Sequence, residues 1–124
     1  MKTISTDKAP AAIGPYSQAI EVGGFVFASG QIPVDPSTGV IPEGITQQAQ
    51  QALTNVRSIM EAAGLSMKDI IKTTVFIKDM NDFAKVNEVY ASFFDGDYPA
   101  RSCVEVSRLP KDVLIEVEVI AAKR

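Results

Sequence analysis

The segment Tyr98-Pro99-Ala100-Arg101-Ser102-Cys103-Val104-Glu105-Val106 places an arginine at the start of an expected β-strand and the chain's only cysteine two residues later. A guanidinium group stays charged at physiological pH, and its desolvation is costly unless a carboxylate or a phosphate meets it. Arg101 is therefore predicted either to form an internal ion pair, with Glu105 or Glu118 as partner, or to bind an anionic ligand through two parallel hydrogen bonds.

The chain contains no histidine, which is the commonest proton carrier at neutral pH and the commonest metal ligand. Glu116 is accordingly a candidate general base, and its alternative is a solvated residue on an edge strand. Cys103 has no histidine to activate it, so we expect a small buried residue rather than a nucleophile. We expect neither a metal site nor a cofactor.

The composition restricts the class of protein. The 124 residues, 46% hydrophobic and 22% charged, predict one globular domain spanning 1–124. The net charge of −3 disfavours nucleic acid as the main partner. No apolar run approaches the roughly 18 residues of a membrane span, and the N-terminal residues do not resemble a signal peptide, so we expect a cytoplasmic protein without a membrane partner.

Hydrophobic patterns predict the elements of the first half. Residues 16–22 and 25–29 are expected strands, joined by a tight hairpin turn at Gly23-Gly24. The proline-rich residues 31–44 are an expected loop. Apolar residues recur at three- and four-residue steps from 45 to 63, which predicts a helix with Thr46 as its N-cap and Gly64 at its end.

The second half is expected to add a strand, a helix and two further strands. Residues 69–78 are apolar or β-branched on both faces, which favours a central strand. A helix is predicted from Asn81 or Asp82 to Phe94, with Asn81 as its N-cap. Residues 101–107 and 113–122 are then expected to form an antiparallel hairpin. This order predicts an α+β fold whose two helices pack on one face of the sheet.

The expected hairpin also predicts which polar side chains meet. If it is centred on Pro110 and Lys111, Glu105 lies opposite Glu116 and Cys103 lies opposite Glu118. Arg101 and the acidic side chains would then share one side of the sheet, whereas a one-residue slip would separate them. On the second helix, Asn87 lies on or beside the apolar stripe and needs a hydrogen-bond partner.

Several long motifs together resemble the RidA/YjgF family of reactive imine and enamine deaminases. The resemblance spans nearly the whole chain in the same order. The motifs are Ala11-Ala12-Ile13-Gly14-Pro15-Tyr16-Ser17-Gln18-Ala19, Ala28-Ser29-Gly30-Gln31-Ile32-Pro33, and Pro99-Ala100-Arg101-Ser102-Cys103-Val104-Glu105-Val106 with Arg108-Leu109-Pro110-Lys111-Asp112.

The resemblance implies a chorismate-mutase-like fold, a homotrimer packed through its sheets, and three ligand clefts between neighbouring subunits. It also implies cofactor-independent hydrolysis of 2-imino acids, which arise from 2-aminoacrylate, to 2-keto acids and ammonia. The implied catalytic residues are Arg101, which would hold the substrate carboxylate, and Glu116, which would orient or deprotonate the attacking water. The implied substrate-binding residues are Tyr16, Ser29, Asn87, Arg101 and Cys103, the last through its main chain.

From the residues alone, other interpretations stay open. Tyr16 is also typical of half-buried packing, Ser29 of a turn before glycine, and Asn87 of a satisfied core amide. A non-catalytic trimer that binds small carboxylates and regulates a partner would need Arg101 but not Glu116. A ribonuclease or translation-inhibiting activity fits the acidic charge and the missing histidine poorly.

Overall fold

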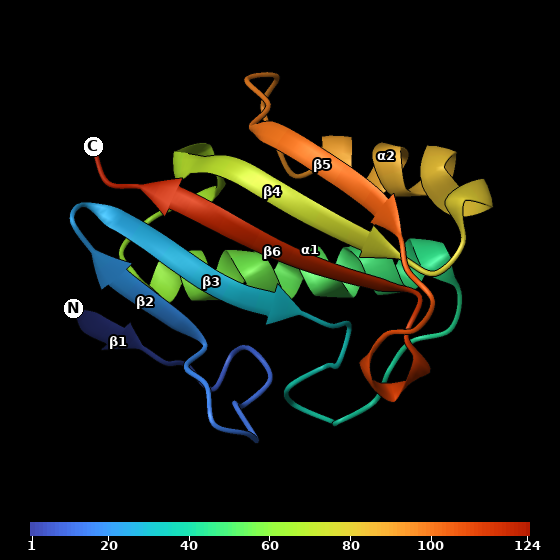
Figure 1. The fold of residues 1–124 in the computed structure, drawn as a ribbon, viewed down its shortest axis with the longest axis horizontal. Helices are drawn as coiled ribbons and strands as arrows, with labels where there is room; N and C mark the ends of the chain where they lie inside the picture. Colours follow the sequence, from blue (N-terminus) through green and yellow to red (C-terminus); the bar gives the residue numbers. More distant parts are fainter.

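A mixed six-stranded sheet forms one layer of the protein and two helices form the other (Figure 1). The computed structural model describes residues 1–124. Strands β2 (Ala19–Val22) and β3 (Phe25–Gln31) form the predicted hairpin, with Gly23 and Gly24 at φ values of 58° and 82°. The elements in chain order are β1 (Lys2–Ile4), β2 (Ala19–Val22), β3 (Phe25–Gln31), α1 (Ile45–Ala62), β4 (Ile70–Ile77), α2 (Phe83–Ala91), β5 (Ala100–Glu105) and β6 (Ile115–Ala122).

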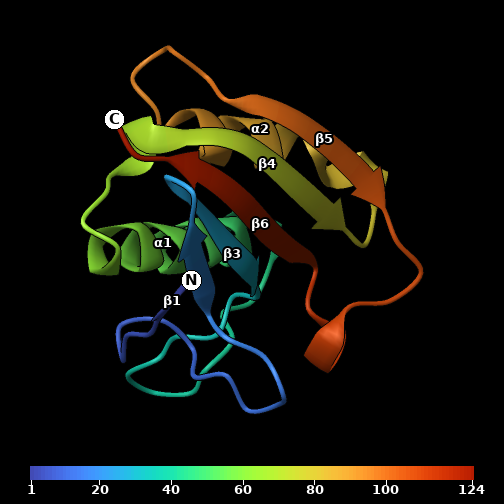
Figure 2. The same ribbon diagram turned by 60° about the vertical axis from the view of Figure 1, so that its left-hand side comes forward.

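The strand order in the sheet is β1-β2-β3-β6-β4-β5. Only the β4–β5 pair is parallel, and the other pairs are antiparallel. Figures 1 and 2 show both helices on the same side of the sheet, with α1 behind β3 and β6 and α2 behind β4 and β5. The predicted α+β fold with two helices on one face and an internal β4 is therefore confirmed.

The predicted hairpin of the last two strands is wrong. β5 is an edge strand that pairs with β4 alone, and β6 lies between β3 and β4. The chain crosses from the edge to the centre through a 3₁₀ turn, Pro110–Asp112, in which Lys111 and Asp112 adopt left-handed backbone angles. The central position suits β6 because Ile115, Val117 and Val119 are almost completely buried.

The first strand of the hairpin begins three residues later than predicted. Tyr16 and Gln18 lie in a loop, and the Gln18 side-chain amide bonds main-chain groups of the N-terminal segment. Gln18 Nε2 donates to the carbonyl oxygens of Thr6 (3.0 Å), Ala9 (3.3 Å) and Pro10 (2.8 Å). These bonds fix the N-terminal loop that precedes β2. The sequence pattern did not predict β1.

The first helix keeps its predicted length but not its predicted cap. Its N-cap is Gly44, with no side-chain hydrogen bond, so the prediction of Thr46 is wrong. A glycine suits this position because its φ is 83°. Gly64 follows the helix at a φ of 76°, as its expected end requires.

The second helix is shorter than predicted. A 3₁₀ turn, Met80–Asp82, precedes it, and the Asp79 carboxylate accepts from the Asn81 N–H, so Asn81 is not the cap. The helix ends at Ala91, three residues before Phe94. Ser92 contributes to this ending because its hydroxyl bonds the Val89 carbonyl oxygen at 2.5 Å.

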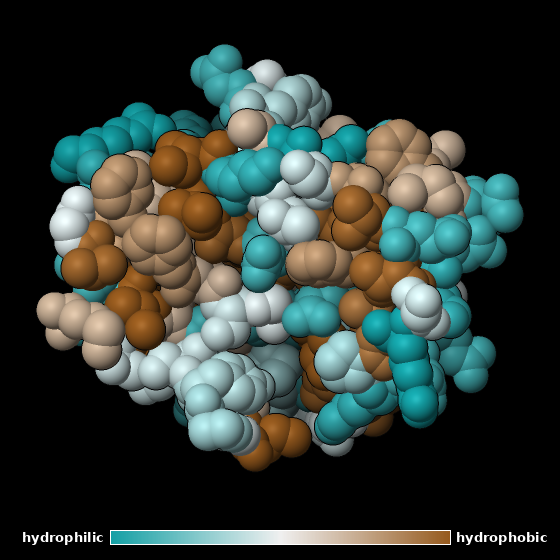
Figure 3. Space-filling view, in the orientation of Figure 1, coloured by the Kyte–Doolittle hydropathy of each residue, from teal (hydrophilic) through white to brown (hydrophobic).

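The hydrophobic core lies between the sheet and the helices, whereas the opposite face of the sheet carries exposed apolar side chains. Phe25, Phe27 and Val104 on that face are 41%, 44% and 43% exposed. Apolar surface is spread over the strands in the space-filling view of this face (Figure 3). None of the helices is long and apolar enough to span a bilayer.

Candidate functional site

Arg101 lies half-buried on the edge strand and forms no ion pair with a carboxylate. Its Nη1 donates to Asn87 Oδ1 at 2.7 Å. This bond gives the neutral Asn87 amide the hydrogen-bond partner that the sequence predicts. Of the two acids considered from the sequence, Glu105 accepts from the Met80 N–H at 2.8 Å, and Glu118 lies on the opposite face of the sheet. The positive charge therefore stays available to an anionic ligand.

Two aromatic rings of α2 support the guanidinium group. The Arg101 Cζ lies 5.4 Å from the ring centroid of Phe83 and 4.8 Å from that of Tyr90, within cation–π range. The Tyr90 hydroxyl is in turn hydrogen-bonded to Thr73 Oγ1 at 2.8 Å, and Thr73 is fully buried. Burial raises the pKa of Tyr90, so its hydroxyl stays neutral at physiological pH.

The sequence analysis did not predict that Phe83 and Tyr90 contact Arg101. The signal was present, because residues 83, 87 and 90 recur at four- and three-residue steps and therefore share one face of the helix. The sequence did not show which strand faces these three residues. The parallel β4–β5 pairing aligns Arg101 with Thr73, and this brings Arg101 over α2.

Cys103 shares the face of β5 that carries Arg101. Burial raises the pKa of its thiol, and the Arg101 charge opposes this only in part. A thiol with a raised pKa stays protonated at neutral pH and is a poor nucleophile. The geometry agrees with the sequence interpretation that Cys103 is a small packed residue beside the arginine.

Glu116 lies on the other face of the sheet, so the prediction that Arg101 shares one side with Glu116 and Glu118 is wrong. Arg101 aligns with Thr73 of β4, whose side chain is buried against the helices. Glu116 aligns with Phe76, which is three residues further along β4. Because side chains alternate along a strand, positions 73 and 76 point to opposite faces. The error follows directly from the mistaken hairpin.

The Glu116 carboxyl group is half-buried next to the end of β3. Burial raises the pKa of Glu116, and the nearby Glu118 charge raises it further. A Cβ atom built on Gly30 would lie 2.0 Å from Glu116 Oε2, so the carboxylate rests directly against this glycine. A raised carboxyl pKa suits proton transfer near neutral pH.

Tyr16 and Ser29 lie close to Gly30, the glycine that contacts Glu116. Tyr16 is 52% exposed and lines a pocket of about 350 Å³ together with Gly30 and Gln31. Ser29 follows the last regular pair of β3, and its hydroxyl donates to the Ser17 carbonyl oxygen at 2.6 Å. The Ser29 side chain thus ties the Tyr16 loop to β3.

The structure therefore brings the six predicted site residues together in two separate groups. Arg101, Asn87 and Cys103 form one group at the free edge of β5. Tyr16, Ser29 and Glu116 form the other around the end of β3. One group can bind a carboxylate and the other can move a proton, but a single chain does not place them around one ligand.

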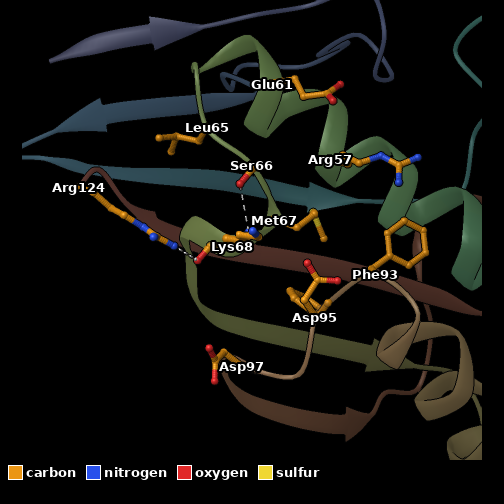
Figure 4. Close-up of a pocket in the computed structure, with 11 residues that line it drawn as sticks. Arg57, Glu61, Leu65, Ser66, Met67, Lys68, Phe93, Asp95, Asp97 and Arg124 are labelled. Carbon is orange, nitrogen blue, oxygen red and sulfur yellow. Dashed lines mark hydrogen bonds between the residues drawn. The ribbon is translucent and has the colours of Figure 1, made fainter.

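Another hollow, of about 550 Å³, lies between the C-terminal end of α1 and the link from α2 to β5 (Figure 4). It contains none of the predicted site residues. Its lining includes Arg57, Glu61, Phe93 and Asp95, and the Arg57 guanidinium carbon lies 5.2 Å from the Phe93 ring centroid.

The chain belongs to the family described as endoribonuclease L-PSP, which includes the RidA/YjgF proteins and matches residues 6–123. It is 60% identical over 126 aligned positions to a 2-iminobutanoate/2-iminopropanoate deaminase from Salmonella typhimurium, covering 99% of this chain and 98% of that protein. It is also 61% identical to a RutC family protein from Pyrococcus horikoshii, with 98% of each chain covered.

The fold also superposes closely on solved structures. The crystal structure of the YjgF gene product from Escherichia coli is 57% identical and superposes with a TM-score of 0.97 over all of both chains. Escherichia coli TdcF, determined with bound serine, gives the same identity, TM-score and coverage.

Proposed function

We propose that residues 1–124 form a single domain that acts as a 2-iminobutanoate/2-iminopropanoate deaminase. The substrates are small 2-imino acids, and the products are the 2-keto acid and ammonia. The observation that supports this most directly is the Arg101 guanidinium, which has an amide and two rings around it but no counter-ion. The identity of about 60% to a deaminase along the whole chain supports the same reaction.

In the proposed mechanism Arg101 binds the substrate carboxylate through two hydrogen bonds and so positions the adjacent imine carbon. Water adds to the protonated C=N bond while Glu116 accepts a proton from it. The same carboxyl group then returns the proton to the nitrogen. As the C–N bond breaks and ammonia leaves, the Glu116 carboxylate accepts the hydroxyl proton, the carbonyl group of the 2-keto acid forms, and the proton passes to water. Cys103 contacts the substrate through its main chain, and Tyr16 and Ser29 lie beside the attacking water. These steps use no group beyond the protein and water.

We infer that each site is completed by a second copy of the chain. Arg101 and Glu116 lie on opposite faces of one sheet, so the two residues can meet one substrate only if they come from different subunits. The exposed apolar face with Phe25, Phe27 and Val104 supplies a surface for such assembly. A homotrimer closed through these faces, with three equivalent clefts, fits the proposal.

The test is a coupled assay in which a pyridoxal-phosphate enzyme generates 2-aminoacrylate and the release of pyruvate is measured. The wild-type protein should speed pyruvate release, and Arg101→Ala should abolish this effect while the oligomeric state is unchanged. Exposed Arg108→Ala serves as the matched control, since its only ion pair, with Asp112, is exposed. Failure of the wild-type protein to speed release would refute the proposal.

The same preparation separates catalysis from binding alone. A non-catalytic carboxylate-binding protein needs Arg101 but has no use for Glu116. We expect Glu116→Gln to lower turnover by about 10²- to 10⁴-fold, the usual contribution of a general base. Binding of 2-oxobutanoate, measured by calorimetry, should persist in that variant. Unchanged turnover would favour the regulatory alternative.

A further inference from the structure

The end of β3 contains a bulge that faces Glu116. Ala28 pairs with Val119 and Gln31 pairs with Val117, so three steps along β3 match two steps along β6. The extra residue breaks the alternation of the strand, which is why Ala28 and Gln31 are both buried on the helix side. Ser29 and Gly30 lie between them.

The Glu116 side chain occupies the space where a side chain at position 30 would lie. A Cβ atom at position 30 would lie 2.0 Å from Oε2, 2.8 Å from Cδ and 3.0 Å from Cγ of Glu116. The whole end of the glutamate side chain thus packs against the Gly30 backbone. The backbone of Gly30 does not have a left-handed φ, so the missing side chain, and not the conformation, is what the position needs.

Gln31 holds this part of the backbone in place. Its side chain is buried, with 4% of the residue exposed, and folds back along its own strand. Its Nε2 donates to the Ser29 carbonyl oxygen at 3.1 Å and approaches that of Gly30 at 3.5 Å. On the other side, the Ser29 N–H donates to the Gln18 carbonyl oxygen at 2.9 Å. The bulge is thereby fixed on both sides.

We propose that Gly30 and Gln31 are positioning residues for Glu116: the bulge held by Gln31 presents a bare backbone surface that sets where the carboxylate lies and shields one side of it from water. This inference rests on the proposed function, in which Glu116 transfers the proton. The shielding accounts for part of the burial that raises the pKa of Glu116. Gly30 also lines the pocket that contains Tyr16. A displaced Glu116 carboxylate would therefore move away from the edge of this pocket.

The test is Gly30→Ala. The atoms that must move belong to the end of a flexible side chain, so the fold should survive while the carboxylate is displaced. We expect kcat to fall by about 10- to 100-fold, since a misplacement of about 1 Å can cost that much. Binding of 2-oxobutanoate should stay within about threefold of wild type, because Arg101 is not touched. Gln31→Met, which keeps the size but loses the Nε2 donor, should change kcat in the same direction.

A pH profile separates positioning from a general loss of structure. Displacement into water should lower the pKa of Glu116, so the acid limb of the kcat profile should move to lower pH in Gly30→Ala. Neither variant alters a charged group of this region; those groups include Glu118 on β6, Lys72 and Lys78 at β4, and Asp7, Asp35 and Lys111 around the pocket. An acid limb and a kcat equal to those of wild type would overturn the inference.

A double-mutant cycle supplies the control. If Gly30 acts through Glu116, adding Gly30→Ala to Glu116→Gln should leave the residual kcat unchanged. A further fall of the same size in that background would mean that Gly30 acts independently. If the wild-type protein hydrolyses no imine, the proposed function fails, and the inference is judged by the Glu116 carboxyl carbon. Its NMR titration should move to lower pH in Gly30→Ala, and an unchanged titration would overturn the inference.

Discussion

At the scale of single residues, the protein combines a cation without a counter-ion and a carboxyl group whose pKa is raised. Arg101 is held by neutral and aromatic groups, which orient it without cancelling its charge. Glu116 is half-buried and near a like charge, which favours its protonated form. A carboxylate ligand and a proton transfer are the chemistry that these two environments suit.

Arg101→Lys tests the two-bond geometry. Lysine keeps the positive charge but offers a point donor in place of a planar fork. We expect kcat/KM for the imino acid to fall by about 10- to 100-fold, the worth of one charge-assisted hydrogen bond, with most of the change in KM. Steady-state kinetics in the coupled assay measure this. A KM equal to that of wild type would show that Arg101 does not bind the carboxylate as a fork.

Glu118→Gln tests the electrostatics of Glu116. Removing the neighbouring negative charge should lower the pKa of Glu116, because that charge is one of the two causes that raise it. If Glu116 acts as a base, turnover is lost as pH falls through this pKa, so the acid limb of the profile should move to lower pH in the variant. A shift to higher pH would contradict the assignment.

At the scale of elements, α2 acts as a platform for the edge strand β5. Tyr90 connects the two through its ring, which faces Arg101, and its hydroxyl, which bonds Thr73. Tyr90→Phe should keep the ring but remove the buried hydrogen bond, lowering the free energy of unfolding by about 1–2 kcal/mol with little change in KM. Tyr90→Leu should also raise KM. Urea unfolding and kinetics measure the two effects, and equal KM values for the two variants would argue against the platform.

The elements also show what the sequence could predict. Local patterns were sufficient for both helices and for the hairpin at Gly23-Gly24, because these depend on neighbouring residues. They failed for β5 and β6, whose alternating patterns fit an edge hairpin as well as two strands separated by β4. That pairing depends on long-range contacts, and it decides whether Arg101 and Glu116 share a face. The sequence pattern could not predict the bulge at Gly30 either, because the role of this glycine depends on the Glu116 side chain that packs against it in the fold.

At the scale of the whole molecule, the open face of the sheet should be an interface between copies. Phe27→Asp places a charge on this face without altering the core, because the side chain is 44% exposed in a single chain. We expect a folded monomer by light scattering and circular dichroism, with no turnover. Val40→Asp, at a position 59% exposed in the loop before α1, is the matched control and should keep assembly and activity. An active, fully assembled Phe27→Asp variant would contradict this interface.

Mixing Arg101→Ala with Glu116→Gln tests most directly whether the two residues act from different chains. Each variant alone should be almost inactive. If each cleft takes Arg101 from one subunit and Glu116 from its neighbour, equal amounts refolded together should regain about one quarter of wild-type activity in a closed ring with random assembly. A mixture as inactive as its two components would contradict the account.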